Sequence, residues 1–183
     1  MVTSGSLWQK VEVNGEKLKD SGKIAMLLLT GEYQHVIDDK SRVLISNRLR
    51  CQIDVDVHGS SFYLVLGANG VLCLYPEKYF EQIVQAVAPA TSAADEAVSF
   101  ERMSFALASK VELDSQGRLL INERLRTRAG LANQITLVGV RDHIELWNSE
   151  NWEQYVEDHM TQYQNQMAQA RKEVLQQQNQ EIL

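Results

Sequence analysis

The amino-acid sequence predicts an α+β fold made of two similar halves and extended by a C-terminal helix. Three observations lead to this prediction: a segment that occurs twice, short apolar runs bounded by turn residues in each copy, and an amphipathic stripe near the end. The chain has 183 residues, of which 44% are hydrophobic and 23% charged, and this composition is typical of a globular domain. A chain of this length buries enough surface to fold without disulfide bonds.

The repeated segment reads HVIDDKSRVLISNRLR in residues 35–50 and VELDSQGRLLINERLR in residues 111–126. The copies are identical at 7 of 16 positions, whereas unrelated segments of average composition match at about one. A second match relates residues 71–82 to residues 143–154, at a shift of 72 instead of 76. The difference of four indicates extra residues in the first copy, within residues 51–61. We interpret the pattern as a duplicated unit.

Each copy begins with a predicted hairpin. Alternating apolar residues predict a short strand, Asp together with Ser or Gly predicts a tight turn, and a second apolar run predicts the return strand. In chain order these elements are the strands 33–37 and 110–113, the turns 38–41 and 114–117, and the return strands 42–45 and 118–121.

The second part of each copy adds helices and another pair of strands. Ser46 and Asn122 are expected to N-cap short helices that carry the Arg-Leu-Arg triplets. Pro76 marks the start of a longer helix in the first copy, and Asn148 or Ser149 caps its counterpart in the second. The strands expected here are 62–66, 71–75, 135–138 and 143–147, with a turn at 67–70.

The remaining segments set the domain boundaries. Small residues between the copies predict a linker, and a helix is expected to follow it over residues 100–108. The predicted organisation is an N-terminal extension (1–25), a first repeat (26–87), a linker (88–99), a second repeat (100–158) and a Gln-rich helical tail (159–183).

The C-terminal helix carries a continuous apolar stripe with spacings of three and four residues. Its members are Trp152, Val156, Met160, Tyr163, Met167, Ala170 and Val174. Two interpretations stay open beyond Tyr163. Either the Gln-rich end frays in solvent, or the stripe packs against other copies of the chain in an oligomer.

The residues described above resemble the MraZ family of bacterial regulators of the division and cell wall gene cluster. The resemblance rests on Gly31-Glu32-Tyr33 and on two Asp-x-x-x-Arg motifs, at 38–42 and 114–118, and it covers approximately residues 26–158. It implies a double swapped-hairpin barrel, made of two tandem repeats and related to the AbrB-type (SpoVT-AbrB domain) regulators. It also implies a ring-like homo-oligomer that binds direct repeats of double-stranded DNA in its own promoter region, usually as a repressor.

In this family the two Asp-x-x-x-Arg motifs carry DNA binding, so the resemblance assigns that role to Asp38, Arg42, Asp114 and Arg118. This sequence departs from the family pattern in its loops. Ser41 stands where a glycine is usual, although Gly117 retains it in the second copy. The proline that commonly follows the return strand is absent, because residues 46–47 and 122–123 read Ser-Asn and Asn-Glu.

The distribution of charge points to the same two motifs as a candidate DNA-binding surface. The formal net charge is −6, but segments 38–50 and 114–128 hold 8 basic and 4 acidic residues, a net +4. The rest of the chain holds 10 basic and 20 acidic residues, a net −10. This asymmetry indicates a local basic surface on an acidic protein. It adds Lys40, Arg48 and Arg124 to the predicted DNA contacts.

Arginine suits such a contact because its planar guanidinium binds a phosphate or a guanine edge with two hydrogen bonds. An aspartate four residues earlier either holds the guanidinium in place or bonds the amides of the turn. The alternative is a purely structural turn in which the arginine is solvated or paired with the aspartate. Duplication of the motif in an arginine-rich setting favours DNA contact.

No metal, cofactor or small-molecule substrate is predicted. Residues 54–59 resemble the start of a calcium loop, but Val65 stands at the twelfth position, where a bidentate Glu is needed. The four histidines lack zinc-ligand spacing, and Cys51 and Cys73 do not complete a zinc set. No catalytic motif occurs either, so the chain is not expected to be an enzyme.

The sequence therefore favours a sequence-specific DNA-binding regulator that represses its own division and cell wall gene cluster. The alternative is an AbrB-like oligomeric interaction module or antitoxin with weak or no specific DNA binding. No apolar run is long enough for a membrane span and no signal peptide is recognisable, so a cytoplasmic, nucleoid-associated location is expected.

Overall fold

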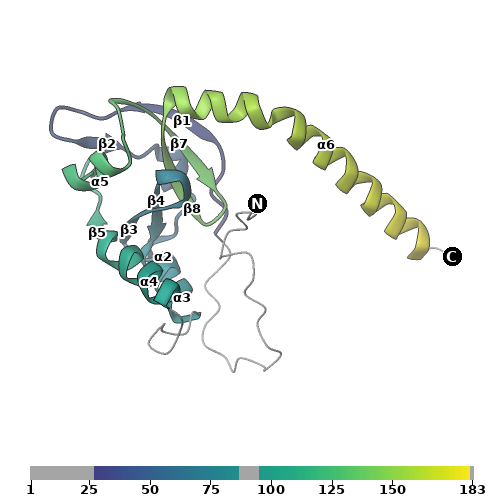
Figure 1. Ribbon diagram of the computed structural model, residues 1–183, viewed down its shortest axis with the longest axis horizontal. Helices are drawn as coiled ribbons and strands as arrows, with labels where there is room; N and C mark the ends of the chain where they lie inside the picture. Colours follow the sequence, from purple (N-terminus) through teal and green to yellow (C-terminus); the bar gives the residue numbers. More distant parts are fainter. Residues whose placement is uncertain (1–26, 87–94, 182–183) are drawn as a thin grey trace.

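The structure is a computed structural model that describes residues 27–86 and 95–181 (Figure 1). The expected N-terminal extension lies outside the described residues, as do residues 88–94 of the expected linker. The first copy of the repeat contains β1 (Glu32–Val36), β2 (Arg42–Leu44), α1 (Asn47–Arg50), α2 (Val55–His58), β3 (Ser61–Leu66), the 3₁₀ turn η2 (Ala68–Gly70), β4 (Leu72–Pro76) and α3 (Glu77–Ala86).

The second copy repeats this order after an intervening helix. The intervening helix is α4 (Asp95–Leu107), and the second copy consists of β5 (Ser109–Glu112), β6 (Arg118–Leu120), α5 (Glu123–Arg128), β7 (Gln134–Val140), β8 (His143–Asn148) and α6 (Ser149–Glu181). One expected boundary needs correction. Helix α4 begins at Asp95 instead of residue 100, so the last residues of the expected linker are helical. The extra residues of the first copy form α2, whose N-cap Asp54 accepts a hydrogen bond from the amide of Asp56.

Six strands form one antiparallel sheet in the order β1-β7-β8-β4-β3-β5. The two outer strands are exchanged between the copies, because β1 pairs with β7 of the second copy and β5 pairs with β3 of the first. The α+β class, the antiparallel sheet and the C-terminal helix are confirmed. Within the described residues the sheet is open, with β1 and β5 at its edges, so the expected closed barrel is not seen.

The two remaining strands, β2 and β6, form a separate two-stranded ribbon. Val43 lies opposite Leu119 at its centre, and these two residues are equivalent in the duplicated sequence. The pairing of β4 with β8 is arranged in the same way, with Cys73 opposite Glu145. Equivalent strands that pair antiparallel are related by a two-fold rotation, so the duplication places an approximate two-fold axis through both pairs.

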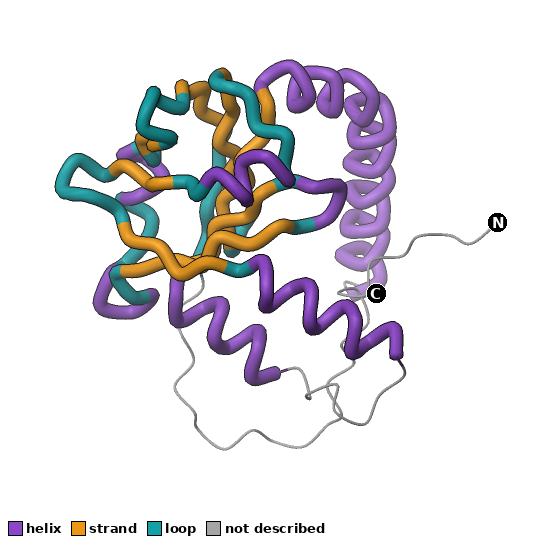
Figure 2. The backbone as a smooth tube through the Cα atoms, turned by 60° about the vertical axis from the view of Figure 1, so that its left-hand side comes forward, coloured by secondary structure: helices purple, strands orange, loops and turns teal. Residues whose placement is uncertain are grey.

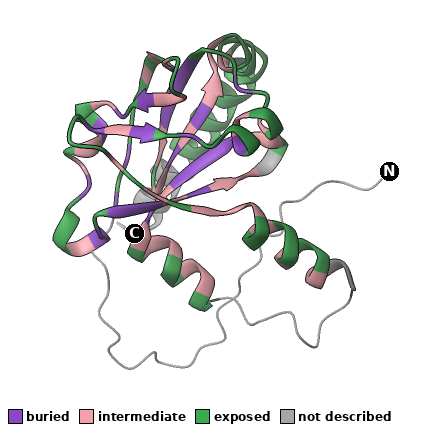
Figure 3. Ribbon diagram, turned by 90° about the vertical axis from the view of Figure 1, so that its left-hand side faces the viewer, coloured by how far each residue is buried: buried purple, intermediate pink, exposed green. Residues whose placement is uncertain are grey.

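The hydrophobic core contains residues of both copies, and its buried stretches lie mainly on the strands (Figure 3). Many of its members are equivalent residues, such as Ile45 with Ile121 and Leu49 with Leu125, and all four are essentially inaccessible to solvent. Other fully buried side chains in the described residues include Leu29, Val43, Leu64, Leu72, Leu74, Leu119, Ile135, Leu137, Ile144 and Leu146. Because each copy supplies about half of the core, neither copy buries its apolar face alone.

Helices α3 and α6 follow equivalent strands and pack in equivalent ways. The ring of Phe80 on α3 lies 5.8 Å from that of Tyr75 on β4, and the ring of Trp152 on α6 lies 5.5 Å from that of Trp147 on β8. Helix α4 also packs against the sheet, on β3, at the same end as α3 (Figure 2). The aromatic contacts of Phe80 and Trp152 therefore hold α3 and α6 against the sheet.

Beyond its first turns, α6 leaves the body of the protein (Figure 1). The side chains of residues 157–172 are all exposed. No helix in the described ranges is both long and apolar enough to cross a membrane. The expected cap Asn148 precedes α6, but its side chain bonds the amide of Ala132 and the carbonyl of Gly130 instead of the helix amides.

The expected caps of the two short helices behave differently. The side chain of Asn122 accepts a hydrogen bond of 2.9 Å from the amide of Leu125 and thus caps α5. Ser46 occupies the equivalent position before α1, but its side chain makes no capping hydrogen bond. The prediction of a capping side chain is therefore confirmed in the second copy. In the first copy, Ser46 stands at the predicted N-cap position, but the predicted capping hydrogen bond is absent.

Candidate nucleic-acid interface

The turn between β1 and β2 and the turn between β5 and β6 have the same geometry. In the first, the amide of Ser41 donates to the carbonyl of Asp38 (2.9 Å), and the amide of Asp38 donates to the carbonyl of Arg42 (2.8 Å). The second turn repeats both bonds. Its fourth residue, Gly117, has a φ of 77°, and Ser41 has a φ of 58°. A tight turn followed by a left-handed residue is typical of a hairpin that contains a bulge.

One carboxylate organises each turn. Oδ1 of Asp38 accepts the amides of Lys40 and Arg42, both at 2.9 Å, while Oδ2 accepts Nε (2.9 Å) and Nη2 (2.6 Å) of Arg42. Asp114 makes the same set of contacts with Gln116 and Arg118. The aspartate thus does both things that the sequence suggested, because it bonds the amides of the turn and also holds the guanidinium.

These contacts keep the two aspartates ionised. The hydrogen bond from the Arg42 side chain, followed by that from its backbone amide, lowers the pKa of Asp38 to about 2. Arg118 lowers the pKa of Asp114 to about 2 in the same way. A carboxylate that accepts several hydrogen bonds favours its charged form. Both ion pairs are therefore intact at neutral pH.

The β2·β6 ribbon places the two motifs on one surface. Arg42 lies opposite Leu120, and Leu44 lies opposite Arg118, while the central pair faces the core. Because side chains alternate between the two faces of a strand, these four residues share the outer face. Leu44 is 42% exposed and Leu120 is 57% exposed. We call this surface, made of Arg42, Leu44, Arg118 and Leu120, the ribbon face.

Each turn is attached to the other copy as well as to its own. The amide of Ile45 donates to the carbonyl of Gly117 (3.0 Å), and the amide of Ile121 donates to the carbonyl of Ser41 (2.9 Å). These two bonds are equivalent under the approximate two-fold axis. The position of one Asp-x-x-x-Arg motif is therefore coupled to the position of the other.

Arg50 and Arg126, the last residues of the Arg-Leu-Arg triplets, brace the turns from the side. Nε of Arg50 donates to the carbonyl of Ile45 (3.0 Å), and its guanidinium lies so close to Gly117 that a Cβ there would be 2.6 Å from Cζ. Arg126 instead reaches the hydroxyl of Ser41 (3.3 Å). This difference explains why serine fits in the first turn, whereas a side chain at Gly117 would be strained and would have to displace the guanidinium of Arg50.

The other predicted contacts lie on the surface beside the turns. Lys40, Arg48 and Arg124 are exposed, and none of them forms an ion pair within the described residues. Arg124 and Arg128, one helical turn apart on α5, line a shallow hollow of about 360 Å³. These basic side chains are thus available to an anionic partner.

The structure brings together Asp38 with Arg42, Asp114 with Arg118, and both pairs through the ribbon, while Lys40 lies within the first turn. Sequence reasoning missed the bracing role of Arg50 and Arg126. A signal was present, because each follows directly after a leucine that is buried, Leu49 or Leu125. On a short helix, the neighbour of a buried residue lies partly toward the core, and only the first arginine of each triplet is fully on the outside.

Comparison with known proteins shows which family this chain is similar to. The family model of the MraZ protein, whose description also carries the term antitoxin-like, matches residues 28–103 and again residues 104–176. Three similar proteins are each named transcriptional regulator MraZ. That of Finegoldia magna is 35% identical over 136 residues (74% of this chain, 92% of the relative). The Lachnoclostridium phytofermentans protein is 34% identical over 143 residues (77% and 96%), and the Pediococcus pentosaceus protein is 32% identical over 131 residues (72% and 88%).

The difference between the two turns predicts opposite effects of two substitutions. Gly117→Ala forces a side chain into a left-handed conformation and displaces Arg50, so we expect it to lower the free energy of unfolding by about 1–3 kcal/mol. Ser41→Gly removes a strained side chain and only a long hydrogen bond, so it is expected to change the stability by less than about 1 kcal/mol. Urea unfolding of both variants measures this, and equal destabilisation would contradict the assigned geometry.

The low pKa values of the two aspartates predict a loss of stability in acid. Because each folded-state pKa is about 2 and lies below the ordinary value of 3.8, the stabilisation is complete above about pH 4 and is lost as the pH falls toward 2. The double variant Asp38→Asn, Asp114→Asn is expected to lose less stability over this range. Unfolding measured from pH 6 to pH 2 tests the prediction. Asp39→Asn, at an exposed neighbour, serves as the control and should keep the acid dependence of the unmodified chain.

Proposed function

The chain belongs to the MraZ family, and from this membership we propose that it is a DNA-binding transcriptional regulator that meets DNA with its ribbon face and the two adjoining turns. The observation that carries the proposal is the pair of equivalent Asp–Arg turns, joined through β2 and β6, in the part of the sequence that concentrates positive charge. The names of the relatives support it, since each is called a transcriptional regulator.

The basic residues divide into two roles. Arg42 and Arg118 each use Nε and Nη2 on an aspartate, which leaves further N–H groups of the same rigid guanidinium for a phosphate or a base edge. Their charge is partly compensated by that aspartate, so they orient the complex more than they attract DNA. Lys40, Arg48 and Arg124 are exposed and supply the general attraction to phosphates.

A single surface of this size neutralises few phosphates and binds weakly at physiological salt. A ring-like oligomer on direct repeats overcomes this limit, because neighbouring subunits engage the DNA at a high effective concentration. We therefore propose that the protein binds direct repeats in its own promoter as a ring, represses its division and cell wall gene cluster, and is associated with the nucleoid. The exchange of outer strands between the copies supports its assignment to the swapped-hairpin, AbrB-like folds.

The projecting part of α6 is the surface we assign to contacts between subunits. Its large apolar side chains are exposed: Tyr155 (40%), Met160 (42%), Tyr163 (56%) and Met167 (52%). Met160, Tyr163 and Met167 belong to the stripe that the sequence predicted, whereas Tyr155 lies beside it and packs on Trp147 and Trp152. Burial of such a stripe against another copy of the chain would remove apolar area from water, whereas fraying would leave it exposed.

Removal of the exposed arginines is expected to weaken DNA binding without unfolding the protein. The double variant Arg48→Ala, Arg124→Ala should lower affinity for the upstream DNA and reduce the slope of log affinity against log salt by about 0.9 for each phosphate that is no longer neutralised. Gel-shift titrations at several salt concentrations provide the measurement. Arg171→Ala, Lys172→Ala is the matched control, because it removes the same charge from the distant part of α6.

Two results of this experiment would count against the proposal. An equal loss of affinity in the control would mean that net charge, and not the ribbon face, drives binding. If the unmodified chain failed to shift its upstream DNA even at low salt, the alternative role as an interaction module or antitoxin would be favoured.

The stripe on α6 predicts an oligomer that depends on apolar contacts. Tyr163→Ser, Met167→Ser is expected to lower the mass of the particle in solution, because it removes two of the exposed apolar side chains. Light scattering after gel filtration measures the mass. Gln162→Ser, Gln166→Ser is the control, because it changes polar residues on the same helical turns. If the Tyr163→Ser, Met167→Ser variant kept the mass of the unmodified particle, the interpretation that the end of α6 frays in solvent would be favoured.

A further inference from the structure

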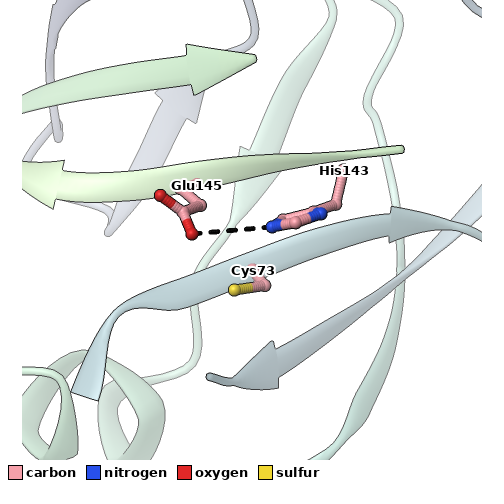
Figure 4. A group of neighbouring side chains, drawn as sticks. All are labelled: Cys73, His143 and Glu145. Atoms are coloured by element: carbon pink, nitrogen blue, oxygen red, sulfur yellow. Dashed lines mark ion pairs between the residues drawn. The ribbon is translucent and has the colours of Figure 1, made fainter. Parts of the chain in front are cut away.

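A second cluster of chemically active side chains lies away from the ribbon face, in the middle of the main sheet (Figure 4). The thiol of Cys73 on β4, an imidazole nitrogen of His143 and a carboxylate oxygen of Glu145, both on β8, all lie within 4.8 Å of one another. Cys73 and Glu145 are directly opposite each other in the β4·β8 pairing. The spacing of cysteines and histidines along the chain gave no sign of this group, because 70 residues separate Cys73 from His143.

The ring of His143 is held from its other side. Its Nδ1 lies 2.6 Å from Oδ1 of Asp142, and Oδ2 of Asp142 accepts a hydrogen bond of 3.0 Å from the hydroxyl of Tyr79. The ring also stacks on Tyr75, with 4.6 Å between the centroids. Nε2 therefore faces Glu145, at 3.5 Å from Oε1 (Figure 4). A histidine that binds a metal through one ring nitrogen characteristically donates a hydrogen bond from the other ring nitrogen to a carboxylate, as His143 does here to Asp142.

Glu145 is oriented in a comparable way. Its Oε2 accepts a hydrogen bond of 2.8 Å from Nε1 of Trp147, while Oε1 is the oxygen that faces His143. Cys73 is buried, whereas the side chains of His143 and Glu145 are 14% and 23% exposed. An ion can thus reach the group from the side of His143 and Glu145. The buried thiol lies at the far end of the same site.

We propose that Cys73, His143 and Glu145 bind one zinc ion. A thiolate, an imidazole and a carboxylate are the ligands zinc uses, and its tetrahedral bonds of about 2.0–2.3 Å place ligand atoms about 3.3–3.8 Å apart. Small movements of side chains bring the three atoms from their present separations to that range. Calcium and magnesium are disfavoured because they require oxygen ligands. Water fills the fourth position, and the ion joins the two copies at the centre of the sheet.

Without a metal, the same geometry holds a proton. Burial by itself lowers the pKa of His143, but hydrogen bonds to Asp142, Cys73 and Glu145 outweigh it and raise this pKa to about 11. The metal-free protein therefore has an imidazolium between two carboxylates.

The test uses the full chain, stripped of metal with a chelator and titrated with Co²⁺ as a spectroscopic substitute for Zn²⁺. We expect one Co²⁺ per chain, a thiolate-to-cobalt absorption band, displacement of that band by Zn²⁺, and a rise of the melting temperature with Zn²⁺. Cys73→Ser should abolish the band. Cys51→Ser should keep it, because Cys51 is exposed and lies outside the cluster. Asp142→Asn should weaken the affinity about 10- to 100-fold by releasing the ring of His143.

Three outcomes would overturn the proposal: no stoichiometric binding at micromolar metal, a band that survives Cys73→Ser, or a band that disappears in Cys51→Ser. If Cys73→Ser does not fold, Glu145→Gln provides the second variant. It preserves the shape of the side chain and removes the charged ligand. Unchanged affinity in Glu145→Gln would exclude Glu145 as a ligand and would also overturn the three-residue site. None of these results depends on DNA binding.

Discussion

The antiparallel pairing of β2 with β6 is the constraint on which the arrangement of the two motifs depends. Both strands are only three residues long, and each is the return strand of a hairpin whose turn is held by one aspartate. Their pairing sets the approximate two-fold axis, and the cross-bonds from Ile45 and Ile121 attach each turn to the opposite copy. Without it, the two Asp-x-x-x-Arg motifs would be independent loops with no defined spacing.

The same axis also organises the interior. It runs through the β4·β8 pair, where leucines and isoleucines of both copies meet in the core. Exchange of the outer strands then makes each copy incomplete alone, because β1 and β5 find their partners only in the other half. Equivalent residues meet at the axis but need not be identical. The positions of Cys73 and Glu145 are equivalent, and their difference creates the proposed zinc site.

Basic residues that look alike in the sequence therefore have different physical roles. Arg42 is locked to an aspartate, Arg48 is exposed, and Arg50 supports a turn of the other copy. The second copy repeats this division, with one exception. Arg126 bonds a serine hydroxyl where Arg50 packs on a glycine, so the two turns differ in the residue they tolerate at the left-handed position.

The repeat, the local elements, the Asp–Arg pairs and the amphipathic C-terminal helix followed from the sequence alone, because each depends on residues that are near one another in the chain. Local patterns determine turns, strand alternation and helical stripes. The family resemblance implied an exchange of hairpins, but the strand pairings that make it, the open edges, the bracing by Arg50 and Arg126, and the meeting of Cys73 with His143 were decided only by tertiary structure. They depend on which strands pair across 45 or more residues, and a single sequence contains no local signal for that choice.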